Sequence, residues 1–102
     1  MVQEVKRFIN GIYKIYEDTS FEVGDSPIEL DINTDLGKNS REGYITVDGA
    51  GNILVEIAGE NETYGEQFTM KIGEVFNFEG LEVSKIRLTH VTDSSYRVWA
   101  VP

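Results

Sequence analysis

KIGEVFNFEGLEVSKIRLTHVTDSSYRVWAV, residues 71–101, is the stretch that decides the fold class. Short runs of alternating apolar and polar residues are separated by glycines and by a polar turn at 92–95. This pattern is typical of half-buried β-strands joined by tight turns. In the last run we expect Tyr96, Val98 and Ala100 on the inner face. The stretch therefore predicts the C-terminal part of a compact all-β module.

The same pattern continues towards the N-terminus, where further strands are expected at 28–32, 44–47, 53–57 and 68–72. The glycine-rich turn at 48–52 predicts a β-hairpin between the two strands that flank it. Near Ser84 the alternation slips, which indicates a β-bulge. About eight or nine short strands at this spacing predict a single-domain antiparallel β-sandwich, jelly-roll-like, with a small barrel as the alternative.

The N-terminal segment is less regular. Residues 5–17, VKRFINGIYKIYE, fit both a helical stripe and a strand with two partly apolar faces. Asn10 followed by Gly11 costs a helix about 1 kcal/mol, and the β-branched and aromatic content favours two short strands or one bent strand. We therefore expect residues 1–17 to form an N-terminal strand or arm that pairs with a neighbouring subunit, and residues 18–102 to form the β-sandwich domain.

Composition narrows the classes of partner. The chain has 102 residues, 18 acids, nine bases and a net charge of −9, which argues against binding nucleic acid or an anionic membrane. It has no cysteine, so disulfides and thiolate metal sites are excluded. The beginning, MVQEVKRF, lacks the apolar run of a signal peptide, and no stretch approaches the roughly 20 apolar residues of a membrane helix.

One segment has the spacing of a calcium loop. The candidate ligands are Asp31, Asn33, Asp35 and Glu42, which match positions 1, 3, 5 and 12 of an EF-hand. Leu36 stands where that loop needs a glycine, and the flanking residues predict strands instead of helices. We therefore expect an exposed acidic loop at 33–43, with no metal site and no cofactor.

The only histidine, His90, lies close to potential partners for nucleophilic catalysis. Together with Asp93 and either Ser94 or Ser95, it has the residue types of a Ser-His-Asp triad. These residues are crowded into one turn, and no motif for an oxyanion hole accompanies them. We therefore predict no catalytic residues and expect that the chain is not an enzyme.

Four aromatic side chains exceed what one small core is expected to hold; they are Tyr13, Tyr16, Tyr64 and Trp99. Such residues anchor protein interfaces or stack on sugar rings. A second hypothesis is therefore a carbohydrate-binding module, calcium-assisted, that uses Trp99, Tyr64 and the loop at 33–43. Trp99 could also simply cover the edge of the core. The candidate interface residues are Val5, Ile9, Tyr13, Ile15, Tyr64 and Trp99.

Three stretches, GYITVDGAGNILVEI (43–57), YGEQFTMKIGEVFNFEGLEVSKIRLTH (64–90) and DSSYRVWAV (93–101), resemble small structural proteins of tailed bacteriophages. The resemblance implies a virion component, either a capsid decoration protein or a tail or adaptor part. It implies a protein that acts through assembly, as a trimer or hexamer, with itself and with other virion proteins. The implied location is the virion, after synthesis in the host cytoplasm.

Overall fold

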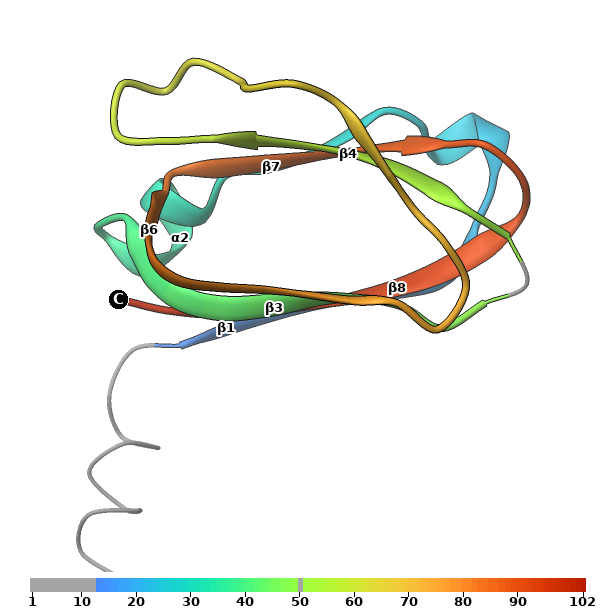
Figure 1. Cartoon of the computed structure of the whole chain (residues 1–102), viewed down its shortest axis with the longest axis horizontal. Helices are drawn as coiled ribbons and strands as arrows, with labels where there is room; N and C mark the ends of the chain where they lie inside the picture. Colours follow the sequence, from blue (N-terminus) through green and yellow to red (C-terminus); the bar gives the residue numbers. More distant parts are fainter. Residues whose placement is uncertain (1–12, 50) are drawn as a thin grey trace, which may run out of the picture.

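The computed structural model describes residues 13–49 and 51–102, so Val5 and Ile9 of the predicted interface lie outside it. In this part of the chain, eight strands enclose one hydrophobic core (Figure 1). The strands are β1 (Lys14–Phe21), β2 (Ile28–Leu30), β3 (Ser40–Val47), β4 (Ile53–Ala58), β5 (Phe68–Met70), β6 (Val75–Val83), β7 (Lys85–His90) and β8 (Ser94–Val101). A 3₁₀ turn, η1 (Val23–Asp25), and a short helix, α2 (Ile32–Leu36), complete the elements.

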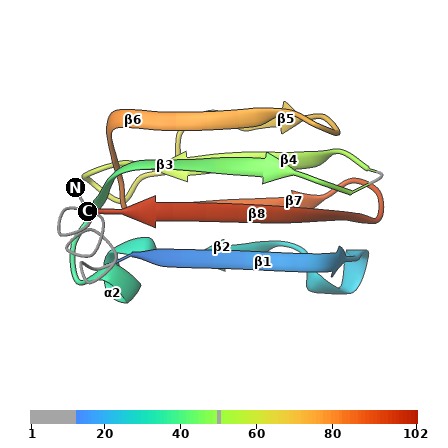
Figure 2. The ribbon, with the colours of Figure 1, turned by 90° about the horizontal axis from the view of Figure 1, so that it is seen from below.

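The strands form two four-stranded sheets, in the orders β1-β8-β3-β6 and β2-β7-β4-β5, and all neighbours are antiparallel. Figure 2 shows β1 and β2 along one border of the sandwich, with β5 and β6 along the opposite border. The first strand pairs with the eighth, the second with the seventh, the third with the sixth and the fourth with the fifth. This is the jelly-roll topology, and two open sheets exclude the small barrel. The predicted β-sandwich is confirmed.

The core lies between the sheets because alternate side chains of each strand point inward. Tyr96, Val98 and Ala100 of β8 are buried, which confirms the inner face expected for the last strand. The largest fully buried apolar side chains come from both sheets and from α2; they are Phe21, Phe78, Ile32, Ile45, Ile53, Ile86 and Leu88. Each fully buried side chain of this size contributes about 1.5–3 kcal/mol, so the packing of the two inner faces dominates stability.

The predicted hairpin at 48–52 is wrong, because β3 and β4 lie in different sheets. The connection instead crosses from one sheet to the other and packs against the β7–β8 turn. A Cβ atom on Gly49 would collide with the backbone of Ser94 and Ser95, and one on Gly51 would collide with Thr92 and Asp93. The glycines at 48–52 suggested a hairpin turn, but their lack of a side chain instead allows the β3–β4 connection to pack closely against the β7–β8 turn.

The predicted β-bulge at Ser84 is also wrong, because the chain changes sheets there. Residues up to Val83 pair with β3, and residues from Lys85 onward pair with β4. The Ser84 N–H donates to the Ala58 carbonyl at 2.9 Å, and its hydroxyl donates to the Gly59 carbonyl at 2.7 Å. The slip in the alternation marks the corner of the sandwich, where a strand leaves one sheet for the other.

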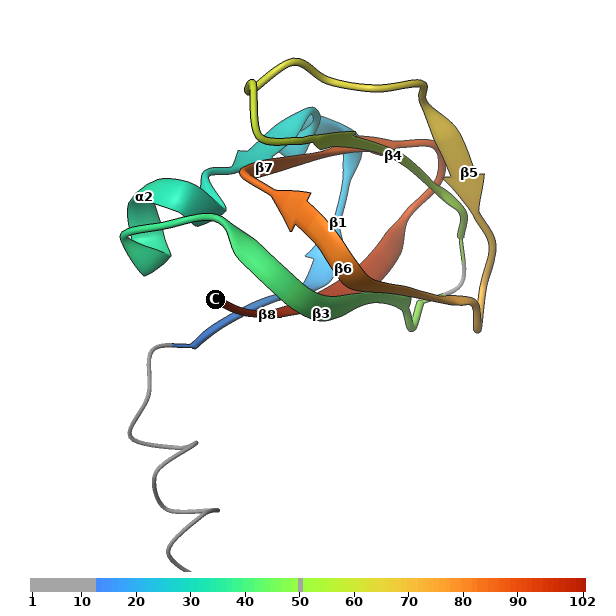
Figure 3. The same cartoon turned by 60° about the vertical axis from the view of Figure 1, so that its left-hand side comes forward.

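The strand predicted at 28–32 ends early, since β2 stops at Leu30 and α2 begins at Ile32. Asp31 caps this helix by accepting a hydrogen bond from the Thr34 N–H at 3.2 Å, and Gly37 ends it with a φ of 81°. Ile32 is still buried, as its position in the apolar pattern required. Figure 3 shows α2 on one side of the sandwich and β5 on the other. None of the helices in the described residues is long and apolar enough to cross a membrane.

The boundary predicted between 17 and 18 falls inside β1. This strand pairs with β8 of the same chain from Lys14 to Phe21, with a register shift after Asp18. Residues 14–17 therefore belong to the sandwich and not to a separate arm. The arm remains a proposal only for residues 1–12, which the structure does not describe.

Gly43 of β3 tests how tightly the sandwich is packed. A Cβ atom there would collide with the Trp99 carbonyl oxygen and lie 2.5 Å from Cζ of Phe78. We expect Gly43→Ala to lower the free energy of unfolding by about 1–3 kcal/mol, measured by urea denaturation. Gly24→Ala is the matched control, because no heavy atom lies within 4 Å of its Cβ position. Equal stability of the two variants would contradict this account of the packing.

Candidate interaction surface

The outer face of the β1-β8-β3-β6 sheet carries a row of large side chains. Ile15, Trp99, Tyr44 and Asn77 are consecutive partners across the four strands. On each strand a direct neighbour packs in the core, namely Tyr16, Val98, Ile45 and Phe78, so these four point outward. The Trp99 and Tyr44 rings are stacked, with centroids 5.8 Å apart and an angle of 26° between the planes. A continuous apolar strip therefore crosses three strands.

Other apolar side chains border this strip. Val75 of β6 is 56% exposed and is the partner of Thr46, on the same outer face. Tyr13 is 44% exposed and stands two positions before Ile15, which is itself 46% exposed. We call Tyr13, Ile15, Tyr44, Val75 and Trp99 the aromatic face. Tyr13, Ile15 and Val75 are exposed, whereas Tyr44 and Trp99 are half-buried. Clustered apolar side chains at the surface mark interaction sites more often than scattered single residues do.

Two residues of the predicted interface, Ile15 and Trp99, are thus cross-strand partners on this face, and the exposed Tyr13 directly precedes β1. The sequence also holds the signal for Tyr44, since it alternates with the buried Ile45. Reasoning from the sequence missed this residue because the stack with Trp99 depends on the β3–β8 register, and strands far apart in sequence set that register.

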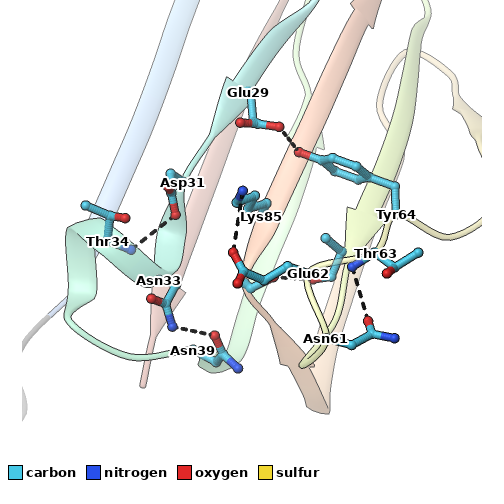
Figure 4. A network of polar contacts seen from close by, with 12 residues as sticks. Glu29, Asp31, Asn33, Thr34, Asn39, Asn61, Glu62, Thr63, Tyr64 and Lys85 are labelled. Carbon is cyan, nitrogen blue, oxygen red and sulfur yellow. Dashed lines mark hydrogen bonds and ion pairs between the residues drawn. The ribbon is translucent and has the colours of Figure 1, made fainter.

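Tyr64 lies on the opposite sheet and is engaged within its own chain (Figure 4). Its hydroxyl donates to Oε2 of Glu29 at 2.6 Å, and the Arg87 guanidinium lies 4.1 Å from its ring centroid. Arg87 also donates two hydrogen bonds of 3.0 Å to the Glu56 carboxylate. Glu29, Arg87 and Glu56 are consecutive partners across β2, β7 and β4. We call Glu29, Arg87, Glu56 and the Tyr64 that lies over them the charged row.

The charged row shifts the acidity of its members. The hydrogen bonds from Arg87 lower the pKa of Glu56. Partial burial, followed by the hydrogen bond to Glu29, raises the pKa of Tyr64. Near neutral pH the Tyr64 phenol therefore stays protonated and the Glu56 carboxylate stays charged. Tyr64 can then only donate to Glu29, and Glu56 can only accept from Arg87.

The candidate calcium ligands are engaged separately. Asp31 caps α2, and Asp35 accepts a hydrogen bond from the Tyr16 hydroxyl at 2.5 Å. Asn33 donates to the Asn39 side chain at 2.7 Å (Figure 4). Glu42 lies in β3. Within 13–49 and 51–102, no group of three or more His, Cys, Asp or Glu residues is arranged to hold a metal ion.

The segment 33–43, expected as an exposed loop, contains most of α2 and the first residues of β3. A polar depression of about 740 Å³ lies beside it. Its residues are Asn33, Gly37, Lys38, Asn39, Arg41, Glu82 and Pro102. Asn39 and Arg41 both donate hydrogen bonds to Glu82, and these bonds lower the pKa of its carboxyl. Sequence reasoning missed Glu82, because its partners lie more than 40 residues away and no local pattern links them.

The residues of the triad considered for His90 do not form one. Its Nε2 lies 3.3 Å from a carboxylate oxygen of Asp93, while the Ser94 hydroxyl donates to the Gly51 carbonyl at 2.8 Å. The backbone N–H of His90 donates to the Ser26 hydroxyl. His90 and Ser94 therefore help to hold the loops at this end of the sandwich.

The chain matches no family model and no curated protein sequence. Among solved structures it is similar to the iron(II) form of the epoxidase HppE, with a TM-score of 0.56 and 12% identity over 94% of this chain and 46% of that one. A protein of Bacillus endospore appendages, described as disulfide-linked pili, has a TM-score of 0.53, 14% identity and coverages of 89% and 88%. The SPBc2 prophage-derived protein YomS has a TM-score of 0.50, 18% identity and coverages of 89% and 96%.

The epoxidase match corrects one expectation. We expected that the chain is not an enzyme, and this comparison contradicts that expectation, since an enzyme has a similar fold. The chain spans less than half the length of the epoxidase. At this identity the likeness shows the fold alone, so it removes an argument against catalysis and assigns no activity.

The charged row predicts a pH-dependent contribution to stability. The pKa of Glu56 is lowered in the folded state, so its contribution is present above the unfolded value of about 4.3 and is lost as pH falls through the folded value. Glu56→Gln should cost about 0.5–1 kcal/mol near neutral pH, because the ion pair is partly exposed.

The measurement is thermal unfolding of wild type and Glu56→Gln across the acid range. The two curves should converge below the folded pKa. Glu66→Gln removes the same charge from an exposed loop residue and is the control. A difference for Glu56→Gln that stays constant down to the most acidic pH would show that the pairing with Arg87 is not its cause.

Proposed function

We propose that this chain is a virion structural protein of a bacteriophage, of the capsid decoration or tail and adaptor type. In this proposal it acts through contacts with other copies of itself and with other particle proteins, and it resides in the virion after synthesis in the host cytoplasm. The observation that carries the proposal is the aromatic face, defined above by Tyr13, Ile15, Tyr44, Val75 and Trp99.

The aromatic face has the chemistry of a protein contact. Trp and Tyr are enriched among the residues that dominate binding energy at interfaces. The stack of Trp99 on Tyr44 already restricts both rings, so less side-chain entropy is lost when a partner covers them. Ile15 and Val75 extend the apolar surface at the two edge strands of the sheet.

Two of the structural comparisons support the proposal because the match extends over most of both proteins. The appendage protein and the prophage-derived protein correspond to this chain over 88% and 96% of their own lengths. One of them belongs to a surface appendage and the other derives from a prophage, as their descriptions state. The sequence resemblance to tailed-phage structural proteins points in the same direction.

The net charge of −9 fits a protein that is synthesised as separate molecules and assembles later. Repulsion between acidic copies opposes premature association. Apolar contact through the aromatic face gains free energy that depends little on salt, while the repulsion is screened by it. Association of copies should therefore strengthen as salt concentration rises.

Ile15→Lys tests the aromatic face directly. Ile15 is half exposed at the outer edge of the sheet, so a lysine there should leave the fold intact and place a charge in the contact. We expect the association constant, measured by light scattering over a concentration series, to fall at least about tenfold.

Val23→Lys is the matched control, since Val23 is a β-branched residue that is 73% exposed in η1, outside the aromatic face. It should assemble like wild type. Melting temperatures of both variants should stay close to wild type. Unchanged assembly of Ile15→Lys, or wild type that stays monomeric at every concentration and salt, would overturn the proposal.

A further inference from the structure

The border of the sandwich formed by β5 and β6 is open and apolar. A groove of about 280 Å³ lies there, lined by Phe68, Thr69, Met70, Glu74, Val75 and Phe76. The rings of Phe68 and Phe76 meet across it, with centroids 5.2 Å apart. Ile72, in the connection between the two strands, is 56% exposed. Apolar side chains from both sheets therefore reach the surface at this border.

The backbone at this border is also unpaired on one side. Among the described strands, β6 has β3 as its one partner and β5 has β4 as its one partner. The regular part of β6 spans residues 75–79, before a register shift near Gly80. A free strand edge beside an apolar groove is the arrangement that accepts an added strand, whose backbone pairs with the edge while alternate side chains enter the groove.

Residues 1–12, MVQEVKRFINGI, have the composition of such a strand. They hold two bases and one acid, whereas residues 13–102 hold seven bases and seventeen acids. Lys6 and Arg7 stand between apolar residues in the run VKRFI. The β6 edge has the opposite charge, since Glu74 lines the groove and Glu79 is exposed on the strand. Segment and edge are therefore complementary in both charge and apolar content.

Geometry favours a second copy as the source of this strand. Residues 1–12 precede β1, and β1 and β6 are the opposite edges of one sheet. To reach its own β6, the segment would have to pass across the end of β8 and β3. Twelve extended residues span about 40 Å, so a copy lying alongside is within easy reach without any crossing.

We propose that residues 1–12 of one copy pair with the free edge of β6 in a second copy and fill the groove beside Phe68 and Phe76. This inference rests on the proposed self-assembly and specifies its geometry: the added segment joins β1 of one copy to β6 of the next, so Ile15 and Val75, at the two edges of the aromatic face, take part in this one contact. Donor and acceptor are different surfaces of the molecule, so the contact is head-to-tail and builds a ring or a filament, not a two-fold dimer. Each copy donates one strand and accepts one.

Complementation between two full-length variants tests this geometry. The donor variant, Val5→Glu with Ile9→Glu, places charges in the segment. The acceptor variant, Thr69→Glu with Ile72→Glu, places charges on one exposed residue of the groove and on the exposed Ile72 beside it, and it leaves the aromatic face unchanged. Leu81→Glu is the matched control, because Leu81 is 51% exposed on β6 but does not line the groove. Masses are measured by light scattering, and folding is checked by thermal unfolding.

We expect wild type and Leu81→Glu to form closed rings or longer chains and each double variant to be monomeric. An equimolar mixture of the two should form one-to-one dimers and nothing larger, because only one productive contact remains. If wild type assembles but the mixture stays monomeric, or either double variant assembles alone, this inference is overturned and the proposed self-assembly stands.

A synthetic peptide of residues 1–12, titrated into the donor variant, separates the remaining outcomes. Saturable binding to the donor variant but not to the acceptor variant supports the groove as the acceptor. If wild type is monomeric throughout and the donor variant still binds the peptide, the segment covers its own edge. That result overturns the second copy as the occupant together with the proposed self-assembly.

Discussion

The sandwich depends on how the chain passes from one sheet to the other without leaving polar groups unpaired. Ser84 makes the passage between β6 and β7 in a fully buried position. Its N–H and hydroxyl donate to the carbonyls of Ala58 and Gly59 at the end of β4, and its carbonyl accepts the N–H of Asn33 in α2. One residue thus joins both sheets and the helix. A buried unpaired amide or hydroxyl would cost about 1–3 kcal/mol, so the corner fixes where β6 ends and where α2 docks.

Much of the fold is predictable from the sequence because the alternation of apolar residues is a local signal. It correctly assigned the inner face of β8 through Tyr96, Val98 and Ala100. It failed where the answer depends on which strand lies next to which. The turn at 48–52 has the composition of a hairpin, yet its glycines serve a close contact with the β7–β8 turn. The slip at Ser84 was visible, but the sequence cannot distinguish a bulge within a sheet from a change of sheet.

The candidate surface was predictable in part for the same reason. Trp99 was identified as surplus to one core and Ile15 as part of an N-terminal arm, and the structure makes them cross-strand partners on one face. Tyr16 was also identified as surplus, but it packs against the core and its hydroxyl donates to Asp35. The stack of Trp99 with Tyr44 and the groove at the β5–β6 border arise from register and topology, which composition does not encode. Tyr64 was identified by the same reasoning, but Glu29 and Arg87 hold it within the opposite sheet.

The charged row gives the molecule two unlike sides. Glu29, Arg87 and Glu56 form a ladder of matched ions over which Tyr64 lies, and every strong polar group in it already has a partner. A partner protein that covered this sheet would remove water from these ions without offering them better contacts. The desolvation cost therefore disfavours burial of this sheet in an interface. In the particle proposed above, the ladder would form the outward, hydrated surface. Antibodies raised against such particles would meet it first, whereas the stacked rings of the other sheet would be covered.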